Sequence, residues 1–195
     1  DAAKKGYNTV LSAGFYIDRM LSVEHHYSVE PIGDVSLTNE ERSRILGGET
    51  TMWSELVTPL TIDSRIWPRT AAIAERLWSP EEINDIENMK HRLKEVSFRL
   101  EELGITHIKN RDVILRGMTN NQDISPLVTL SKICEPLKMY SRNDGGTEYK
   151  TYSPFNLFAD ACVVDAEDAF VFNKINSKFI KTPNNYNSQE LIKYL

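Results

Sequence analysis

The fold is decided by two stretches of sequence, ILGGETTMWSE at Ile45–Glu55 and RIWPRTAAIAERLWS at Arg65–Ser79. The short apolar run from Arg44 to Gly48 ends in two glycines, which is typical of a buried strand that leads into a loop. The second stretch carries several alanines, which are small enough for close packing of a helix against a sheet. This order predicts a strand, a loop and a helix, which together make one β/α unit.

A second strand is predicted upstream, at Asn8 to Ala13 (NTVLSA), because this short run is apolar and rich in β-forming residues. GFYID, Gly14–Asp18, follows at the C-terminal end of that strand. Residues 22–37 show no sustained hydrophobic period and contain Pro and Gly, so they are predicted to be loop. Alternation of strand and helix in this part of the chain favours a parallel α/β arrangement.

The remaining sequence is predicted to be helical. Ser79 and Pro80 begin a capping pattern, and apolar residues then recur every three or four positions until Gly104, which predicts one long amphipathic helix. Beyond about residue 107 the chain is rich in Asn and Lys, with helical patches at 126–134 and 154–173. This region is predicted to be mainly α-helical.

Composition excludes several classes of function. The chain has 195 residues and a net charge of −5, so it lacks the basic surface that nucleic-acid binding requires. No stretch is apolar over the length needed to span a bilayer. Cys134 and Cys162 match no zinc or redox spacing and are interpreted as half-buried thiols, with a disulfide left open. The adjacent His25 and His26 are predicted to be a solvated pair, and no metal site is expected.

These motifs, in this order, resemble the end of the catalytic barrel in family 20 glycoside hydrolases, the β-N-acetylhexosaminidases. In that family a Gly-Gly-Glu strand end precedes Trp-x-Glu, Arg-x-Trp-Pro-Arg and Ala-Glu-Arg-Leu-Trp. LSAGFYID, Leu11–Asp18, resembles the preceding strand. The resemblance implies an α/β fold in which residues 1–108 form the last two β/α units of a (β/α)₈ TIM barrel. Residues 109–195 would then be a mainly helical C-terminal extension.

The resemblance implies that four residues at the C-terminal ends of the strands bind a terminal amino sugar. Trp53 would form the floor of the pocket, since an indole offers a flat apolar face to a pyranose. Glu55 would accept hydrogen bonds from ring hydroxyls, and Asp18 would lie near the 6-position. Tyr16 would hold the acetamido oxygen, which acts as nucleophile in a retaining, substrate-assisted hydrolysis. No cofactor is expected, because the substrate supplies its own nucleophile.

The family's general acid is a Glu that follows Asp in an earlier strand, and this chain contains no Asp-Glu dipeptide. The chain is therefore expected to act together with the remainder of the barrel on an amino-sugar glycan, and to be inactive alone. The family resemblance suggests an exported protein, whether periplasmic, secreted or lysosomal. The alternative is a non-catalytic module, derived from the barrel, that binds carbohydrate or protein. The native glycan and linkage stay open.

Structural roles are the competing interpretations of the same residues. Glu55 could be a surface carboxylate, Trp53 and Tyr16 could be core residues, and Asp18 could cap a helix. Five further charged residues near these motifs are expected to be structural, through pairing of acids with arginines. They are Glu49, Arg65, Arg69, Glu75 and Arg76.

Overall fold

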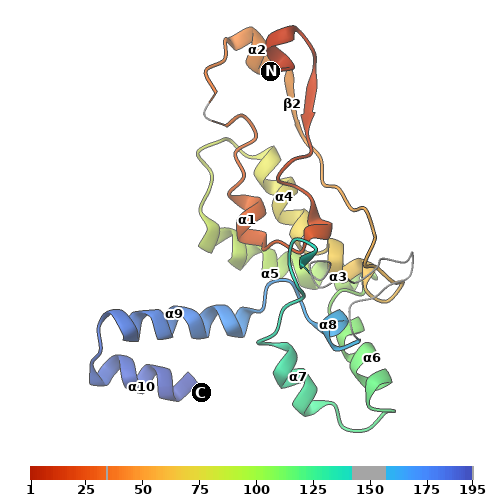
Figure 1. The fold of residues 1–195 in the computed structure, drawn as a ribbon, viewed down its shortest axis with the longest axis vertical. Coiled ribbons are helices and arrows are strands. Elements are labelled where there is room, and N and C mark those ends of the chain that lie inside the picture. Colours follow the sequence, from red (N-terminus) through yellow and green to blue (C-terminus); the bar gives the residue numbers. More distant parts are fainter. Residues whose placement is uncertain (34, 142–156, 195) are drawn as a thin grey trace. The chain divides into compact units, whose positions relative to one another are not determined.

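The computed structural model describes residues 1–33, 35–141 and 157–194 (Figure 1). Two units are distinguished by their internal contacts: described residues 1–110 and 137–141 form the first, and 111–136 and 157–194 form the second. The elements are, in chain order, η1 (Ala3–Lys5), β1 (Thr9–Leu11), η2 (Ile17–Arg19), α1 (Val23–Tyr27), α2 (Asn39–Ser43), β2 (Ile45–Gly48), α3 (Ile62–Ile66), α4 (Arg69–Trp78), α5 (Ile86–Glu102), α6 (Lys109–Met118), α7 (Ser125–Ser131), α8 (Leu157–Ala161), α9 (Glu167–Lys181) and α10 (Asn185–Tyr194).

The first unit is built on a parallel pair of strands, β1 and β2, at the two places where strands were predicted. The register joins Leu11 to Gly48, and the pairing resumes past the strand ends, where Tyr16 forms a parallel bridge with Thr51. Both segments therefore leave the sheet in the same direction. Residues that follow the two strands consequently emerge at one edge, as the sequence predicted.

Close packing beneath the strands requires a glycine at position 48. A Cβ atom there would lie 2.8 Å from the ring of Phe15 and 3.0 Å from the side chain of Leu77. Phe15 is completely buried and packs with Ile17 and Ile73 of α4 in one hydrophobic cluster. This cluster attaches α4 to the sheet directly below the segments that carry the candidate residues.

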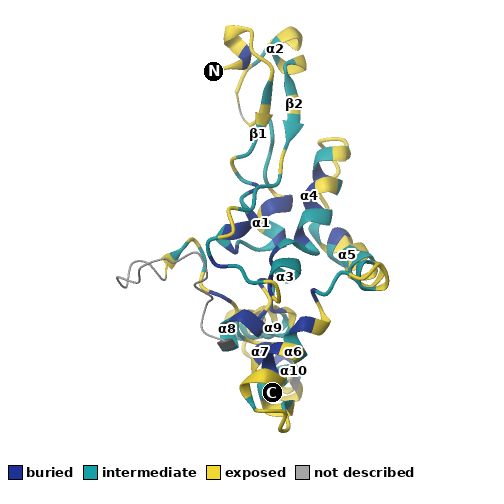
Figure 2. Cartoon of the chain, turned by 90° about the vertical axis from the view of Figure 1, so that its right-hand side faces the viewer, coloured by how far each residue is buried: buried dark blue, intermediate teal, exposed yellow. Residues whose placement is uncertain are grey.

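A second cluster joins α1, α4 and α5. It contains the buried residues Val23, Tyr27, Ala72 and Met89. Figure 2 shows buried stretches of these helices in dark blue. Ala72 is 1% exposed, which agrees with the expectation that the alanines of α4 allow close helix packing. α4 therefore packs on the sheet side through Ile73 and on two further helices through Ala72.

The predicted start of the long helix at Ser79 is wrong. α5 begins at Ile86, and Asp85 is its N-cap, whose side chain accepts the N–H of Asn88 at 3.0 Å. The guanidinium of Arg76 donates to the carbonyl oxygen of Glu81 at 3.1 Å, which holds residues 79–85 in an irregular path. A side-chain hydrogen bond from the end of α4 therefore competes with the capping signal at Ser79.

The prediction that residues 22–37 are entirely loop is also wrong. They contain α1, whose N-cap Ser22 accepts the N–H of His25 at 3.1 Å. A five-residue helix is too short to show a hydrophobic period, and it is stabilised mainly by its packing on α4. A complete capping box, formed by Thr38 and Glu41, starts α2.

The regular secondary structure among the described residues of the second unit is all helical. Ile114, Leu115 and Ala161 form its buried centre, with contributions from α7 and α8. α9 and α10 lie side by side, and Lys178 donates to Glu190 at 2.9 Å between them (Figure 1). The predicted patch at 126–134 corresponds to α7. Residues 154–156 of the other patch lie outside the described residues, and its remainder contains α8 and the start of α9.

The first unit ends at Asn110 and also includes the described residues 137–141. The domain boundary expected between 108 and 109 stays a prediction. Among the helices that the structure describes, none is both long and apolar enough to span a membrane.

Candidate functional site

A ladder of backbone hydrogen bonds joins the two segments that continue from the strand ends, and the candidate residues lie at or just beyond these bonds. The N–H of Ile17 donates to the carbonyl oxygen of Thr51, and the N–H of Thr51 donates to that of Phe15, both at 3.1 Å. Asp18 lies one residue beyond this ladder on the first segment. Trp53 lies two residues beyond it on the second segment. The ladder therefore fixes the two segments that carry the site relative to each other.

The structure brings the carboxylates of Asp18 and Glu55 close enough to influence each other. Asp18 is 5% exposed. Burial raises the pKa of Asp18 above its ordinary value, and the negative charge of Glu55 raises it further. A backbone hydrogen bond and the positive charges of Arg19 and Arg69 oppose this rise. Two acids that emerge from neighbouring strands thus form one electrostatically coupled site.

Several oxygen atoms at this edge are buried without a hydrogen-bond partner among the described residues. They are Oδ1 of Asp18, Oε2 of Glu55 and Oγ1 of Thr51. Buried polar atoms without a partner are costly, and in native proteins they are normally satisfied. A ligand that donates hydrogen bonds would satisfy all three oxygens, because a carboxylate accepts and a hydroxyl can accept. The site therefore suits a ligand rich in hydroxyl groups.

Trp53 differs from the two acids, because 65% of its surface is exposed. Ser54, which separates it from Glu55, has a φ of +67°, in the left-handed region that non-glycine residues rarely adopt. At this turn the chain leaves Trp53 open to solvent while Glu55 is half-buried. This degree of exposure is not that of a core residue, and it leaves the indole available for an apolar ligand face.

Tyr16 is half-buried at the start of η2. The guanidinium carbon of Arg19 lies 4.8 Å from the centroid of its ring, a cation–π contact. Asp18 lies within η2 and is not an N-cap; that position belongs to Tyr16.

Comparison with known proteins identifies the domain that carries these residues. The profile described as "Glycosyl hydrolase family 20, catalytic domain" matches residues 1–81, which include both strands, α4 and all four candidate residues. Residues 1–81 belong to a family 20 glycoside hydrolase catalytic domain. The family resemblance predicted from the sequence motifs is therefore confirmed.

Individual relatives agree with this assignment. The chain is 38% identical over 106 residues to the β-hexosaminidase subunit beta of Sus scrofa, which covers 52% of this chain and 20% of that protein. It is 36% identical over 115 residues to β-hexosaminidase subunit A2 of Dictyostelium discoideum, 54% of this chain and 21% of that protein. The chain thus spans about a fifth of the length of these relatives.

A solved structure covers nearly the whole chain. The X-ray structure of Flavobacterium johnsoniae chitobiase superposes with a TM-score of 0.92 and 56% sequence identity. The match covers 98% of this chain and 30% of the chitobiase. The similarity therefore continues beyond residue 81 into the helical part of the chain, where the family profile does not match.

The loop that carries Asp18 in this family 20 domain is anchored by Arg69 of α4. Its guanidinium donates to the carbonyl oxygens of Ile17 and Leu21, each at 2.9 Å, and Arg69 itself is 2% exposed. The expected pairing of acids with arginines is found at Arg76, which lies 2.7 Å from Glu30. Through its two backbone carbonyl partners, Arg69 supports the segment that carries Asp18.

Glu75 follows the expected acid–arginine pattern. It lies 2.5 Å from the guanidinium of Arg92 and also accepts the hydroxyl of Tyr27 at 2.7 Å. These contacts join α4 to α1 and α5 and are structural.

Tyr140 is a site residue that sequence reasoning missed. Its hydroxyl donates a hydrogen bond to Oδ2 of Asp18, although 122 residues separate the two along the chain. Tyr140 lies far beyond the residues that match the family profile. No motif surrounds it, so the sequence offered no signal by which to find it.

The prediction that His25 and His26 are a solvated pair is wrong for His26. His25 is exposed, whereas His26 is completely buried, with Nδ1 2.7 Å from the carbonyl oxygen of Gly14. Burial lowers the pKa of His26 to about 4. Among the described residues no three His, Cys, Asp or Glu side chains are placed to hold a metal ion.

Burial of His26 predicts a loss of stability in mild acid. Its pKa is about 4 when folded against an ordinary value of 6.5, so the unfolded state binds the proton more tightly. The contribution of His26 is complete above pH 6.5 and is lost as the pH falls toward 4, by about 3 kcal/mol in total. Urea unfolding at pH 7.5 and pH 4.5 measures this difference.

His26→Asn is the test variant, because an amide can still donate to Gly14 but does not titrate. We expect the stability of this variant to depend less on pH than that of the wild type. His25→Asn, which alters the exposed neighbour, serves as the matched control and should retain the wild-type dependence. An equal pH dependence in all three proteins would contradict the prediction.

Proposed function

We propose that the protein carrying this chain is a β-N-acetylhexosaminidase, which removes terminal β-linked N-acetylglucosamine or N-acetylgalactosamine from glycans. Residues 1–108 would supply the last two β/α units of its (β/α)₈ barrel, and residues 109–195 would form a helical extension. The parallel pairing of β1 with β2, each followed by site residues and helix, supports this arrangement. The relatives named hexosaminidase and chitobiase support the substrate class.

The observation that carries the proposal is the combination of an exposed indole with two acids, each of which has a buried oxygen without a partner among the described residues. Oδ1 of Asp18 and Oε2 of Glu55 are buried without a partner among the described residues, and Trp53 is largely exposed two positions before Glu55. A pyranose has hydroxyls at its rim, which donate to carboxylates, and C–H groups on its faces, which stack on an indole. One hexose ring can satisfy both kinds of group at once.

In the proposed mechanism the acetamido oxygen of the substrate attacks the anomeric carbon, in place of an enzyme nucleophile. The hydroxyl of Tyr16 would hold that oxygen in line for attack, which is a positioning role. Trp53, Glu55 and Asp18 would bind the ring away from the scissile bond. The general acid would come from the remainder of the barrel, since these 195 residues contain no Asp-Glu pair.

The exposed side chains of the sheet support the proposed association with the remainder of the barrel. Val10 of β1 is 51% exposed, and Leu46 of β2 is 63% exposed. Parallel sheets are usually covered on both faces, and their strands are apolar for that reason. Further strands and side chains of a closed barrel would cover these two residues.

The proposed role of Glu55 predicts a defect in Glu55→Gln. Hydrogen bonds to a charged group contribute about 2 kcal/mol, so we expect kcat/KM to fall roughly 30-fold. The measurement is hydrolysis of a chromogenic N-acetylglucosaminide by the full-length protein. Glu82→Gln, which alters an exposed acid outside the site, is the control and should stay within twofold of wild type. Unchanged activity in Glu55→Gln would remove Glu55 from the pocket, and an inert wild type would refute the proposed reaction.

A further inference from the structure

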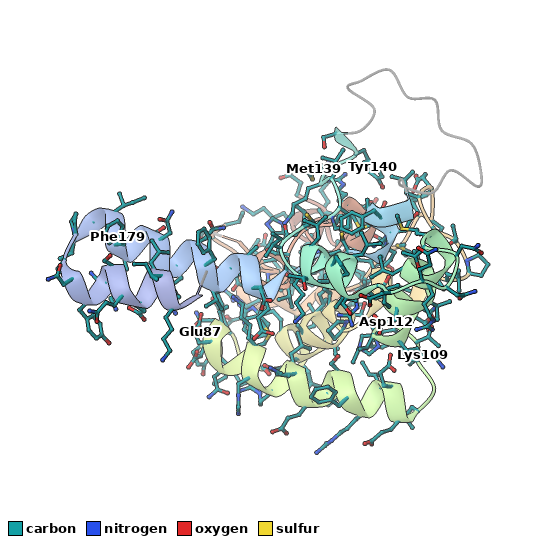
Figure 3. All side chains as sticks on the ribbon, turned by 90° about the horizontal axis from the view of Figure 1, so that it is seen from below. Glu87, Lys109, Asp112, Met139, Tyr140 and Phe179 are labelled. Carbon is teal, nitrogen blue, oxygen red and sulfur yellow. The ribbon has the colours of Figure 1, made fainter. Side chains whose placement is uncertain are left out.

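The short segment 137–141 contacts the candidate site at two successive residues. The backbone N–H of Met139 donates to the carbonyl oxygen of Arg19 at 2.8 Å, and the hydroxyl of Tyr140 donates to Oδ2 of Asp18. Met139 and Tyr140 follow one another on this segment (Figure 3). A backbone contact and a side-chain contact thus hold the segment against the loop that carries Asp18.

The backbone conformation of this segment is unusual. Met139 and Tyr140 have φ values of +55° and +56°, so two successive non-glycine residues are left-handed. This conformation is unfavourable for residues with a Cβ atom, and it persists only where the surrounding contacts require it. The contacts with Arg19 and Asp18 are made at this point of the chain. The left-handed backbone therefore coincides with the placement of the Tyr140 hydroxyl on the acid.

We propose that Tyr140 is a positioning residue of the sugar site, which holds the carboxylate of Asp18 through Oδ2 and leaves Oδ1 for a hydroxyl of the bound sugar. The inference rests on the proposed function and adds to it a residue that lies outside the family profile. The two oxygens of Asp18 differ in their hydrogen bonds. Oδ2 accepts from the phenol of Tyr140, and Oδ1 is buried without a partner among the described residues.

A carboxylate that is held at one oxygen has fewer orientations available when the ligand arrives. The hydrogen bond from a phenol to an ionised carboxylate is charge-assisted, so it both orients the group and favours its ionised form. Because Tyr140 donates to Oδ2, Oδ1 is the oxygen of Asp18 that is left without a protein donor and can accept from the sugar. Tyr140 would thus act on binding of the sugar and not on the bond that breaks.

The charges around Asp18 set the direction of the pH effect. Glu55 disfavours the ionised form, whereas Arg19, Arg69 and a backbone hydrogen bond favour it. Loss of the Tyr140 hydroxyl removes one further group that favours ionisation, so the pKa of Asp18 should rise. If the ionised acid binds the sugar, the acid limb of the kcat/KM profile should move to higher pH, since this limb reports groups of the free enzyme.

Tyr140→Phe tests the proposal in the full-length protein with a chromogenic N-acetylglucosaminide. We expect KM to rise about tenfold with kcat within twofold, because the lost contact acts on ground-state and transition-state binding alike. The acid limb should also shift to higher pH. A loss of folded enzyme that is equal at every pH does not move the pH at which kcat/KM falls to half. Circular dichroism of wild type and variant over the same pH range therefore separates positioning from a loss of folding.

Two further variants complete the test. Tyr7→Phe removes the hydroxyl of a tyrosine that is 65% exposed, and it should leave both KM and the acid limb unchanged. In an Asp18→Asn background, Tyr140→Phe should produce no acid-limb shift and less than a twofold change in KM, because its effect acts through the carboxylate. An active wild type with an unchanged KM and acid limb in Tyr140→Phe would overturn this inference alone. An inert wild type would instead overturn the proposed function.

Discussion

Trp53→Ala is expected to lower kcat/KM for a terminal N-acetylglucosaminide by about 150-fold. Truncating an aromatic side chain that anchors a ligand costs about 3 kcal/mol, and every 1.4 kcal/mol corresponds to a factor of ten. Because 65% of the Trp53 surface is exposed, the same change should lower the free energy of unfolding by less than about 1 kcal/mol. Steady-state kinetics and thermal unfolding of the full-length variant measure the two effects.

Trp78→Ala provides the matched control for this prediction. Trp78 is the last residue of α4 and is 93% exposed, but it does not lie on either segment that carries the site. Its removal should leave kcat/KM within twofold of wild type. Comparable losses in both variants, or a Trp53→Ala enzyme that keeps more than half its activity, would show that the indole of Trp53 does not form the pocket floor.

Arg69→Met is expected to destabilise the family 20 domain by about 4 kcal/mol. The guanidinium is buried and donates to the carbonyl oxygens of Ile17 and Leu21, and methionine would leave both buried acceptors without this donor. Each unsatisfied buried group costs about 1–3 kcal/mol, in addition to the lost hydrogen bonds. Chemical unfolding of the full-length protein measures the change in stability.

A substitution at a surface arginine controls for the loss of positive charge that Arg69→Met also causes. Arg42 lies 3.8 Å from Glu81, and the two side chains are 48% and 64% exposed. Exposed ion pairs contribute less than about 1 kcal/mol, so Arg42→Met should be nearly neutral. Arg69→Met should also lose activity at temperatures where it is still folded, because the loop with Asp18 loses its anchor. Equal stability of the two variants would contradict the anchoring role.

The elements that carry the site were predictable from local patterns. The strand at Ile45–Gly48 ends in two glycines, and a side chain at position 48 would collide with Phe15. A strand that ends in Gly-Gly can be recognised in the sequence. The parallel arrangement followed from the alternation of strand and helix. Since the ends of parallel strands meet at one edge, the proximity of Asp18 and Glu55 could be predicted without coordinates.

Other features depended on side-chain contacts and helix packing that no local pattern encodes. The predicted helix start at Ser79 was wrong, and the carbonyl of Glu81 in that segment accepts from Arg76 of α4 instead. The predicted solvation of His26 was wrong because α1 packs on α4. A local pattern encodes what a segment favours by itself. It does not encode which tertiary partner competes for the same backbone groups.

The amino-acid sequence by itself determined the family, the two strands, and the four residues proposed to bind sugar, because each of these depends on spacing within a short segment. Only the tertiary structure decided that Arg69 and Tyr140 support that site, through the carbonyls bound by Arg69 and the carboxylate of Asp18, and that His26 is buried. The physical reason is that these contacts need two or more segments to meet in space, and a meeting of segments 122 residues apart leaves no periodic or spacing signal in either one.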